Sequence, residues 1–383
     1  VEAILAARAP PSSADRLNRY MKRSELEETL TAFLQKPITS SGKYLVVFGP
    51  RGAGKTTLVS HVLEKMDNGV LFVPVTEKAA TESGLEGIVL KRALDQYKPL
   101  EESVHANSTP LKSEALADRL KAAADERREN GEKDWRPTLV LEIDQMVGHE
   151  LIKDSCRLLK RLTHDQQLCH AVLVLSSSSA VASLTSDKTR QRFLRVGVFT
   201  HGEASAFLKA SLKEMLPENV ATSKAVDDVS ERFLQLTTLP QDAIDFTDAM
   251  LGSKTEDELR ARAEAFANEL EEAARRDVEC AAKINVFNTL LCDQTGKSPM
   301  FTTSDLMREL LHIGAPAKLP NPKCDVPPGI FAARIRESEH AKMAFDVDLI
   351  SGAVDFASGA HRKAAAELAA RRGLLNWLFG SRM

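Results

Sequence analysis

The sequence predicts an α/β protein: a three-layer core built on a parallel sheet, followed by a region that is almost entirely helical. Over the first half of the chain, short apolar runs of strand length alternate with amphipathic runs of helix length. This alternation is typical of a mostly parallel sheet covered on both faces. The strand-like runs are residues 44–48, 70–75, 137–144 and 171–175, with 194–199 as a candidate fifth. After His201 the strand pattern stops and helical patterns take over.

The chain is long enough for more than one domain. It has 383 residues, of which 43% are hydrophobic, so two or three domains with sizeable cores are expected. We divide the sequence into a flexible N-terminal arm (1–18), an α/β core (19–200), a helical segment (201–254) and a C-terminal domain (255–383).

Composition and charge narrow the class of protein. The formal net charge is −3 and the isoelectric point is near 6.4, so nucleic acid is not favoured as a partner. The five cysteines are scattered without metal-ligand spacing, which indicates reduced thiols inside a cell. We expect a cytoplasmic protein, or an organellar one if the Ala- and Arg-rich start is the remainder of a transit peptide. No apolar run reaches about 18 residues, so no transmembrane span is expected.

Local signals set the helices of the first half. A helix is expected over 20–35, with Ser24 as its N-cap and Glu27 as the other half of a capping box. Pro37 to Gly42 ends it. The remaining helices are expected over 57–66, 84–97, 113–131 and 150–163. The helix over 113–131 is so rich in charge that most of it should face solvent.

The second half reads as helices with one hairpin. Three helices are expected over 203–252 and a long one over 255–293. Apolar residues alternate on both sides of Ser351-Gly352, which predicts a hairpin over 345–356. A final helix is expected over 361–378.

The segment after Gly373 carries many large apolar side chains: Leu374, Leu375, Trp377, Leu378 and Phe379. Such a segment either docks on the protein's own helical domain or anchors to a partner groove or an anionic membrane surface. We expect docking, in which case removal of residues 373–383 lowers the melting temperature.

One motif carries most of the chemical information. Residues 49–56 read G-P-R-G-A-G-K-T and fit G-x-x-x-x-G-K-[ST], between a buried strand and an amphipathic helix. In that context the loop's backbone N–H groups surround a β-phosphate, Lys55 reaches the β and γ oxygens, and Thr56 offers its hydroxyl to Mg²⁺. The alternative is a glycine-rich turn without a ligand. We predict a nucleoside triphosphate bound by Gly49, Pro50, Arg51, Gly52, Ala53, Gly54, Lys55, Thr56 and Thr57.

A carboxylate on a neighbouring strand must help to hold the metal. Asp144 ends the run 139–144, at the end of a strand where ligands collect, so it is the candidate for this position, the Walker B acid. Its alternative role is to cap the next helix. Gln145 follows it and can orient water but cannot accept a proton. The general base for the attacking water must then come from another position. Glu142, on the same side of the strand as Asp144 by alternation, is the candidate for that base, or else it pairs with a buried cation. Slow hydrolysis is the expected consequence.

Two further positions are candidates for contact with the γ-phosphate. Ser176 follows the fourth strand and has a hydroxyl suited to sensing that phosphate, although a serine-rich turn explains it equally. Arg190, Arg192 and Arg195 come next, and any of them is a candidate arginine finger, in the same chain or toward a neighbour, or a plain surface residue.

These residues resemble a known family. The segments Tyr20-Met-Lys-Arg-Ser-Glu-Leu-Glu-Glu-Thr-Leu30 and Val46-Val-Phe-Gly-Pro-Arg-Gly-Ala-Gly-Lys-Thr-Thr57 resemble the opening of archaeal-type and STAND-class AAA+-like ATPases. The segment 198–208 is similar to the start of their helical lid, and Thr237-Thr-Leu-Pro240 stands where they keep a G-x-P turn that contacts the nucleotide. The departures are Gln145 for Glu and Thr238 for Gly. The likeness covers about residues 18–252.

The resemblance implies a P-loop NTPase core with sheet order 5-1-4-3-2, a helical lid over 201–254 in which Pro240 contacts nucleotide, and a helical or winged-helix-like C-terminal domain. It also implies ATP with Mg²⁺ as the cofactors, and hydrolysis to ADP that drives a core–lid movement. No N-K-x-D motif for guanine follows the fourth strand.

Two alternatives remain open at the level of sequence. The first is a nucleotide-gated protein-interaction switch with negligible turnover, which Gln145 favours. The second is a DNA-handling ATPase that uses the winged-helix-like domain. A protein partner or self-association is expected in either case.

Overall fold

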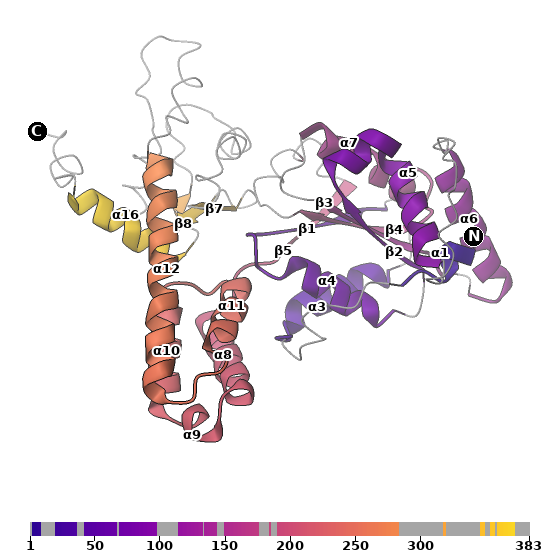
Figure 1. Ribbon diagram of the computed structural model, residues 1–383. Helices are drawn as coiled ribbons and strands as arrows, with labels where there is room; N and C mark the ends of the chain where they lie inside the picture. The colour runs from indigo at the N-terminus through magenta and orange to yellow at the C-terminus, as the bar shows by residue number, and fades with distance from the viewer. Residues whose placement is uncertain are drawn as a thin grey trace, which may run out of the picture. The chain divides into compact units, whose positions relative to one another are not determined.

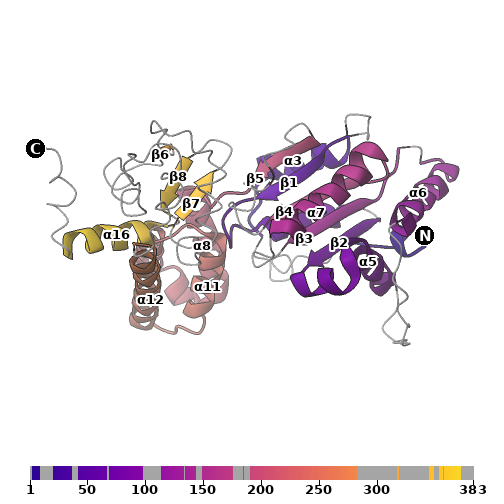
Figure 2. The same ribbon diagram turned by 90° about the horizontal axis from the view of Figure 1, so that it is seen from above.

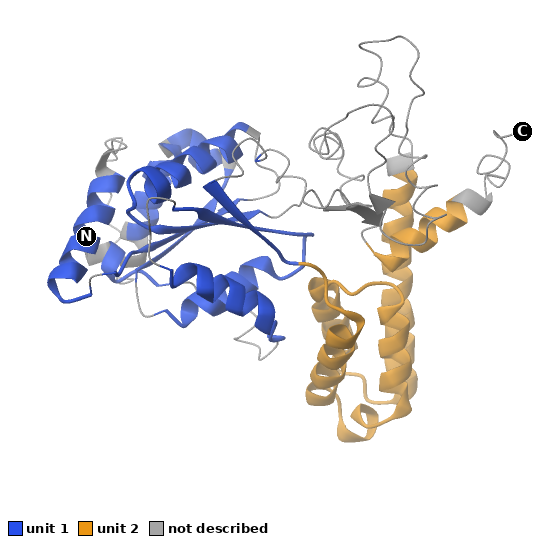
Figure 3. Cartoon of the chain, turned by 180° about the vertical axis from the view of Figure 1, so that it is seen from behind, with its two compact units in different colours: residues 1–196 blue, residues 197–383 orange. Residues whose placement is uncertain are grey.

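The computed structural model describes thirteen parts of the chain: residues 2–8, 20–36, 42–66, 69–97, 114–132, 134–143, 149–175, 184, 190–282, 317–318, 345–348, 353–356 and 358–371. The chain forms two compact units, Val1–Val196 and Gly197–Met383 (Figure 3).

A five-stranded parallel sheet forms the centre of the first unit. Its strands are β1 (Tyr44–Phe48), β2 (Val70–Val75), β3 (Thr138–Ile143), β4 (His170–Leu175) and β5 (Gln191–Arg195). They lie in the order β2-β3-β4-β1-β5, and all pairs are parallel. Read from the other edge, this is the expected order 5-1-4-3-2, so that prediction is confirmed.

Helices cover both faces of this sheet, which gives the predicted three layers (Figures 1 and 2). On one face lie α3 (Ser24–Leu34) and α4 (Lys55–Glu64). On the other lie α5 (Glu77–Tyr97) and α7 (His149–Lys160), which continues into a π-helical turn, η1 (Arg161–Asp165). The α3/α4 face is filled by apolar side chains that include Leu30, Phe33, Leu58, Val62, Val47, Phe72, Val140 and Val172.

The described part of the N-terminal arm is packed and not loose. Helix α1 (Glu2–Leu5) and the residues after it contact α5 and α6 (Glu114–Glu129). Ile4 and Ala7 are buried, and the Ala7 carbonyl accepts hydrogen bonds from the N–H groups of Gly69 and Val70, at 2.8 and 3.0 Å. Small side chains allow this close approach, and the segment covers the start of edge strand β2.

Helix α6 is also less exposed than its charge predicts. Leu116, Leu120, Ala123 and Ala124 are buried on its inner side. One face of four small or apolar residues is enough to pack the helix on α1 and α5, while its many charges occupy the remaining surface.

Two local predictions were wrong. Helix α3 begins at Ser24 with Arg23 as its N-cap, and no side chain caps it, so Ser24 does not form the expected capping box. Strand β5 spans residues 191–195 instead of 194–199. Arg192 and Arg195 are exposed on this strand and Leu194 is buried, and the two arginines conceal the strand in the sequence.

The second unit is a helical bundle followed by a small sheet. Its helices are α8 (His201–Met215), α9 (Glu218–Ala221), α10 (Lys224–Leu234), α11 (Pro240–Met250) and α12 (Glu256–Ala282), so residues 203–252 hold four helices where three were expected. Phe233, Phe246 and Phe266 contact one another in its core. Thr200 and Glu203 form a capping box at the start of α8.

The predicted hairpin is confirmed as β7 (Phe345–Asp348) and β8 (Ala353–Phe356), which pair antiparallel beside a short β6 (Ala317–Lys318). Helix α16 (Gly359–Arg371) then packs along α12 (Figure 1). Residues 302–311, on which the winged-helix prediction depends, and residues 373–383 of the apolar tail lie outside the described residues. Among the helices that the structure describes, none has the length and hydropathy to cross a membrane.

Candidate functional site

The glycine-rich loop is held by close backbone contacts. Gly49 has φ +151°, and a Cβ at this position would lie 2.0 Å from the carbonyl oxygen of Val196, which follows β5. Gly52 and Gly54 also have positive φ, at 77° and 83°. Gly54 is the N-cap of α4 and provides no side-chain hydrogen bond, so the first turn of that helix keeps backbone N–H groups for an anion. The remaining loop residues differ in exposure: Arg51 is exposed, Pro50, Gly52 and Thr57 are half-buried, and Ala53 is buried.

Lys55, the first residue of α4, folds back over the loop. Its Nζ donates hydrogen bonds to the carbonyl oxygens of Gly49 and Pro50, at 3.0 and 2.6 Å, and the residue is only 6% exposed. A buried ammonium held by carbonyl oxygens is a preformed receptor for phosphate oxygens, which are stronger acceptors because they are charged.

Thr56 of α4 and Glu142 of β3 meet on the face of the sheet that α4 covers. The Thr56 hydroxyl donates to Oε1 of Glu142, from a position 86 residues earlier in the chain. Glu142 is half-buried on β3, and a hydroxyl beside a carboxylate is a set of hard oxygen donors. Mg²⁺ is typically held by one or two protein oxygens of this kind, with phosphates and waters as its other ligands, so the residues present fit that ion.

The structure does not describe every predicted site residue. Asp144, Gln145 and Ser176 lie outside the described residues. Arg192 and Arg195 are exposed on the edge strand β5, and Arg190 is half-buried just before it.

Pro240 belongs to the second unit, where it is the first residue of α11. The turn before it is tightly bonded: Thr237 Oγ1 donates to Asp242 Oδ2 at 2.7 Å and accepts from the Leu239 N–H at 3.1 Å. The Thr238 carbonyl accepts from the Phe199 N–H at 3.0 Å. Burial raises the pKa of Asp242, although the hydrogen bond from Thr237 opposes that rise. The turn is thus held by the Thr237 side chain and by the backbone carbonyl of Thr238, the residue that stands where glycine was expected.

The start of α16 contacts the same turn, a contact that the sequence did not predict. The Ala360 N–H donates to the Leu236 carbonyl at 2.8 Å. A Cβ on Gly359 would lie 2.4 Å from the carbonyl oxygen of Gln235. His361 lies 3.5 Å from Asp277 of α12. The only signal for this contact in the sequence is the Ser-Gly pair before a helix.

A second unpredicted cluster lies behind the glycine loop, between α3 and α4. Glu27 is 6% exposed and accepts hydrogen bonds from Tyr20 Oη at 2.9 Å, Lys65 Nζ at 3.2 Å and the Arg23 N–H at 3.2 Å. His61 of α4 stacks on the Tyr20 ring, with the centroids 3.8 Å apart. Burial alone would raise the pKa of Glu27, but the bonds from Tyr20 and Lys65 outweigh it and lower that pKa. This cluster fixes α4, and so Lys55 and Thr56, relative to α3.

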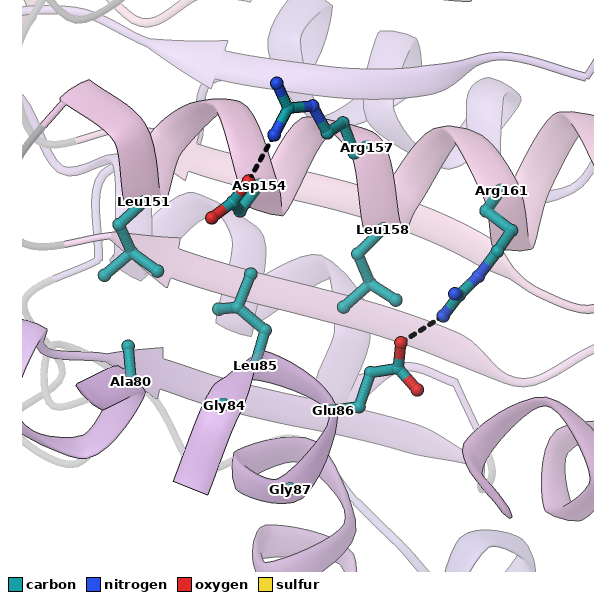
Figure 4. A pocket seen from close by; sticks show the side chains of 10 residues that line it. All are labelled: Ala80, Gly84, Leu85, Glu86, Gly87, Leu151, Asp154, Arg157, Leu158 and Arg161. Atoms are coloured by element: carbon teal, nitrogen blue, oxygen red, sulfur yellow. Dashed lines mark hydrogen bonds and ion pairs between the residues drawn. The ribbon is translucent and has the colours of Figure 1, made fainter. Parts of the chain in front are cut away.

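A hollow of about 510 Å³ lies on the opposite face of the sheet, between α5 and α7 (Figure 4). Leucines 85, 151 and 158 line it, and Gly84 bends α5 there with φ 66°. Its charges are paired with one another: Arg157 with Asp154 at 2.7 Å, and Arg161 with Glu86. None of the predicted site residues lines it.

Thiol chemistry does not fit two of the three described cysteines, Cys156 and Cys169. Cys156, Cys169 and Cys280 are free thiols. Burial raises the pKa of Cys169 to about 12 and that of Cys156 to about 11, which leaves both thiols protonated and unreactive at neutral pH.

The parallel sheet in the order β2-β3-β4-β1-β5, with a glycine loop that leads from β1 into the Lys55-Thr56 helix, defines a P-loop NTPase core. The chain belongs to the family of ATPase domains found predominantly in Archaea, whose model matches residues 27–233, more than half of the 383 residues. It is therefore an ATP-binding NTPase. No curated protein sequence matches the chain.

Three solved structures have a similar fold. One is Drosophila ORC bound to DNA, with 16% identity, a TM-score of 0.42, and 89% of this chain and 86% of that chain covered. A second is Hsp104 in its closed state with ATPγS and casein, with 15% identity, a TM-score of 0.37 and coverages of 81% and 54%. The third is domain III of the Thermotoga maritima replication initiation protein DnaA, with 12% identity, a TM-score of 0.39 and coverages of 68% and 98%.

Proposed function

We propose that this protein hydrolyses ATP to ADP and phosphate with Mg²⁺, slowly, and that the bound nucleotide changes the relation between the α/β core and the helical lid. The arrangement of Lys55 and Thr56 at the glycine loop, with Thr56 bonded to Glu142, carries the proposal. Three elements of the fold, β1, α4 and β3, hold these residues in place before any ligand arrives.

Each residue of the loop has a distinct part in this function. The N–H groups of residues 49–54 and the start of α4 would surround the β-phosphate. Lys55 would exchange the carbonyls of Gly49 and Pro50 for phosphate oxygens, with little movement of its helix. Thr56 would contribute its hydroxyl to the metal site. Mg²⁺, when bound, neutralises charge on the β and γ phosphates.

The attacking water needs a proton acceptor, and the residue after Asp144 does not provide one. Gln145 can orient water by hydrogen bonds but cannot take its proton. Asp144, Glu142 and Ser176 are the other groups we propose near this step, and Pro240 in the lid would contact the nucleotide. General base catalysis is typically worth ~10²–10⁴-fold, so turnover well below that of an efficient ATPase is expected.

A nucleotide-gated switch is the second candidate, because Gln145 stands where the family's base is expected. The two candidates agree on binding and differ in turnover. A switch would hold ATP for many minutes and expose a partner surface, whereas an ATPase would release ADP and phosphate in steady state.

Binding and turnover should be measured on the same preparation. Lys55→Ala should weaken ATP binding by about 100-fold, since a charge-assisted contact is worth ~2–3 kcal/mol. Lys43→Ala is the matched control, because Lys43 is exposed just before β1 and should leave binding unchanged. Unchanged ATP affinity in folded Lys55→Ala would refute the phosphate-binding role. Phosphate release by wild type, absent in Lys55→Ala, would favour the ATPase over the switch, and scattering profiles that differ between ATP and ADP would support the core–lid change.

A further inference from the structure

We propose that Glu142, and not Asp144, is the carboxylate that pairs with Thr56 in the Mg²⁺ site. The acid position on β3 would then lie two residues earlier than the sequence motif indicates. This inference rests on the proposed function, because it assigns a residue within the same nucleotide site.

The register of the sheet fixes where Glu142 lies. It pairs with Pro74 of β2 on one side and with Val174 of β4 on the other. Its backbone is therefore held inside the sheet and does not belong to the loop that follows β3.

Alternation along β3 places Glu142 on the side of α4. Val140 belongs to the apolar core between the sheet and α3/α4, together with Leu58 and Val62 of α4. Since side chains alternate along a strand, Glu142 lies on that same face, one step closer to the end of β3. Its carboxylate thereby reaches the first turn of α4, where it meets the Thr56 hydroxyl.

The chemistry of Glu142 agrees with a metal role. Within the described part of the chain no Lys, Arg or His forms an ion pair with its carboxylate, in contrast to the buried Glu27, which has Lys65. A half-buried carboxylate beside a phosphate-binding loop, with a hydroxyl as its hydrogen-bond partner, would repel a triphosphate unless a cation lies between them. A divalent cation, or a water bound to it, satisfies both groups.

Position and side-chain length explain the contact of Glu142 with Thr56. Glu142 lies within β3, and its carboxylate reaches the Thr56 hydroxyl from there. The longer glutamate side chain allows the earlier position to reach the helix.

The test is the gain in ATP affinity that Mg²⁺ provides, measured by titrating a fluorescent ATP analogue with Mg²⁺ or with EDTA. Glu142→Gln should lose most of that gain, about 10- to 100-fold, while its affinity in EDTA stays near that of wild type. Lys43→Ala, at an exposed position just before β1, is the matched control and should keep the whole gain, and Asp144→Asn, at the competing acid, should keep most of it. Thr56→Val is a second variant at the same contact and should behave like Glu142→Gln.

The opposite pattern, with the gain kept in Glu142→Gln and lost in Asp144→Asn, would overturn the assignment, as would a gain kept in both Glu142→Gln and Thr56→Val. If wild type and Lys55→Ala bind the analogue equally poorly in EDTA, the proposed function itself fails, and this result is distinct from the first two. Thermal melting of each variant shows whether the fold is retained.

Discussion

Alanine at Gly49 should destabilise the α/β unit more than alanine at Gly54, although both glycines belong to the same motif. The Cβ of Gly49→Ala would lie 2.0 Å from the carbonyl oxygen and 3.0 Å from the carbonyl carbon of Val196. Val196 cannot easily give way, because its N–H donates to the Phe48 carbonyl at 2.8 Å, at the end of the β1–β5 pair. Either the loop leaves the sheet edge or the end of the strand pair opens.

The size of the effect follows from two terms. A side chain at φ +151° is strained by ~1–3 kcal/mol, and overpacking against a fixed backbone costs a further ~1–3 kcal/mol. Gly54→Ala has only the first kind of term, since nothing lies within 4 Å of its Cβ at φ +83°, and a left-handed residue costs ~1–2 kcal/mol. We therefore expect Gly49→Ala to lose ~2–6 kcal/mol of unfolding free energy and Gly54→Ala ~1–2 kcal/mol.

Urea unfolding followed by tryptophan fluorescence measures this difference in the first unit. The chain has two tryptophans, and Trp135 lies in the first unit, where its ring approaches Gly69 and Arg127 lies 5.2 Å above it. A Trp377→Phe background leaves Trp135 as the reporter. Equal losses in the two alanine variants would refute the argument that Gly49 is required by its contact with Val196.

Three further predictions concern the surrounding structure. Glu27→Gln should destabilise the first unit by ~1 kcal/mol at neutral pH through loss of the Lys65 ion pair. Because folding lowers the pKa of Glu27, the stability difference between variant and wild type should shrink as pH falls below about 4.5. A stability difference that does not change with pH would contradict this. Gly359→Ala should lower the melting temperature of the second unit, since its Cβ would lie 2.4 Å from the Gln235 carbonyl; retained stability would mean that α16 does not hold that turn. Burial and the charge of Arg136 lower the pKa of His170 to about 4. Acidification from about pH 6.5 to 4 should therefore lower the unfolding free energy of wild type more than that of His170→Gln. Equal losses in the two proteins would count against this environment for His170.

The sequence predicted the parts of the fold that local patterns encode. The apolar runs at 44–48, 70–75 and 171–175 are strands almost residue for residue, because a strand buried on both faces has a nearly continuous apolar sequence. Strand β5 was misplaced by three residues, because Arg192 and Arg195 give an edge strand the composition of a loop.

Contacts between distant segments were beyond sequence reasoning. Alternation placed Glu142 on one side of its strand, but the register of three strands decides that it meets the Thr56 hydroxyl rather than a basic side chain. The cluster around Glu27 depends on how α3 lies against α4, and the burial of Ile4 depends on α5 and α6. In each case the partner is selected by packing, which no local pattern records.

The pairing of α12 with α16 has a consequence for how the protein is made. Two bridges, Lys363 to Glu271 at 2.8 Å and Arg275 to Glu367 at 3.3 Å, join helices that are separated by residues 283–358 along the chain. The first unit has all its described strands by residue 195 and can fold while synthesis continues. The helical unit must wait for residues 359–371 to leave the ribosome, so until then the surface of α12 that α16 covers stays open to chaperones and to neighbouring chains.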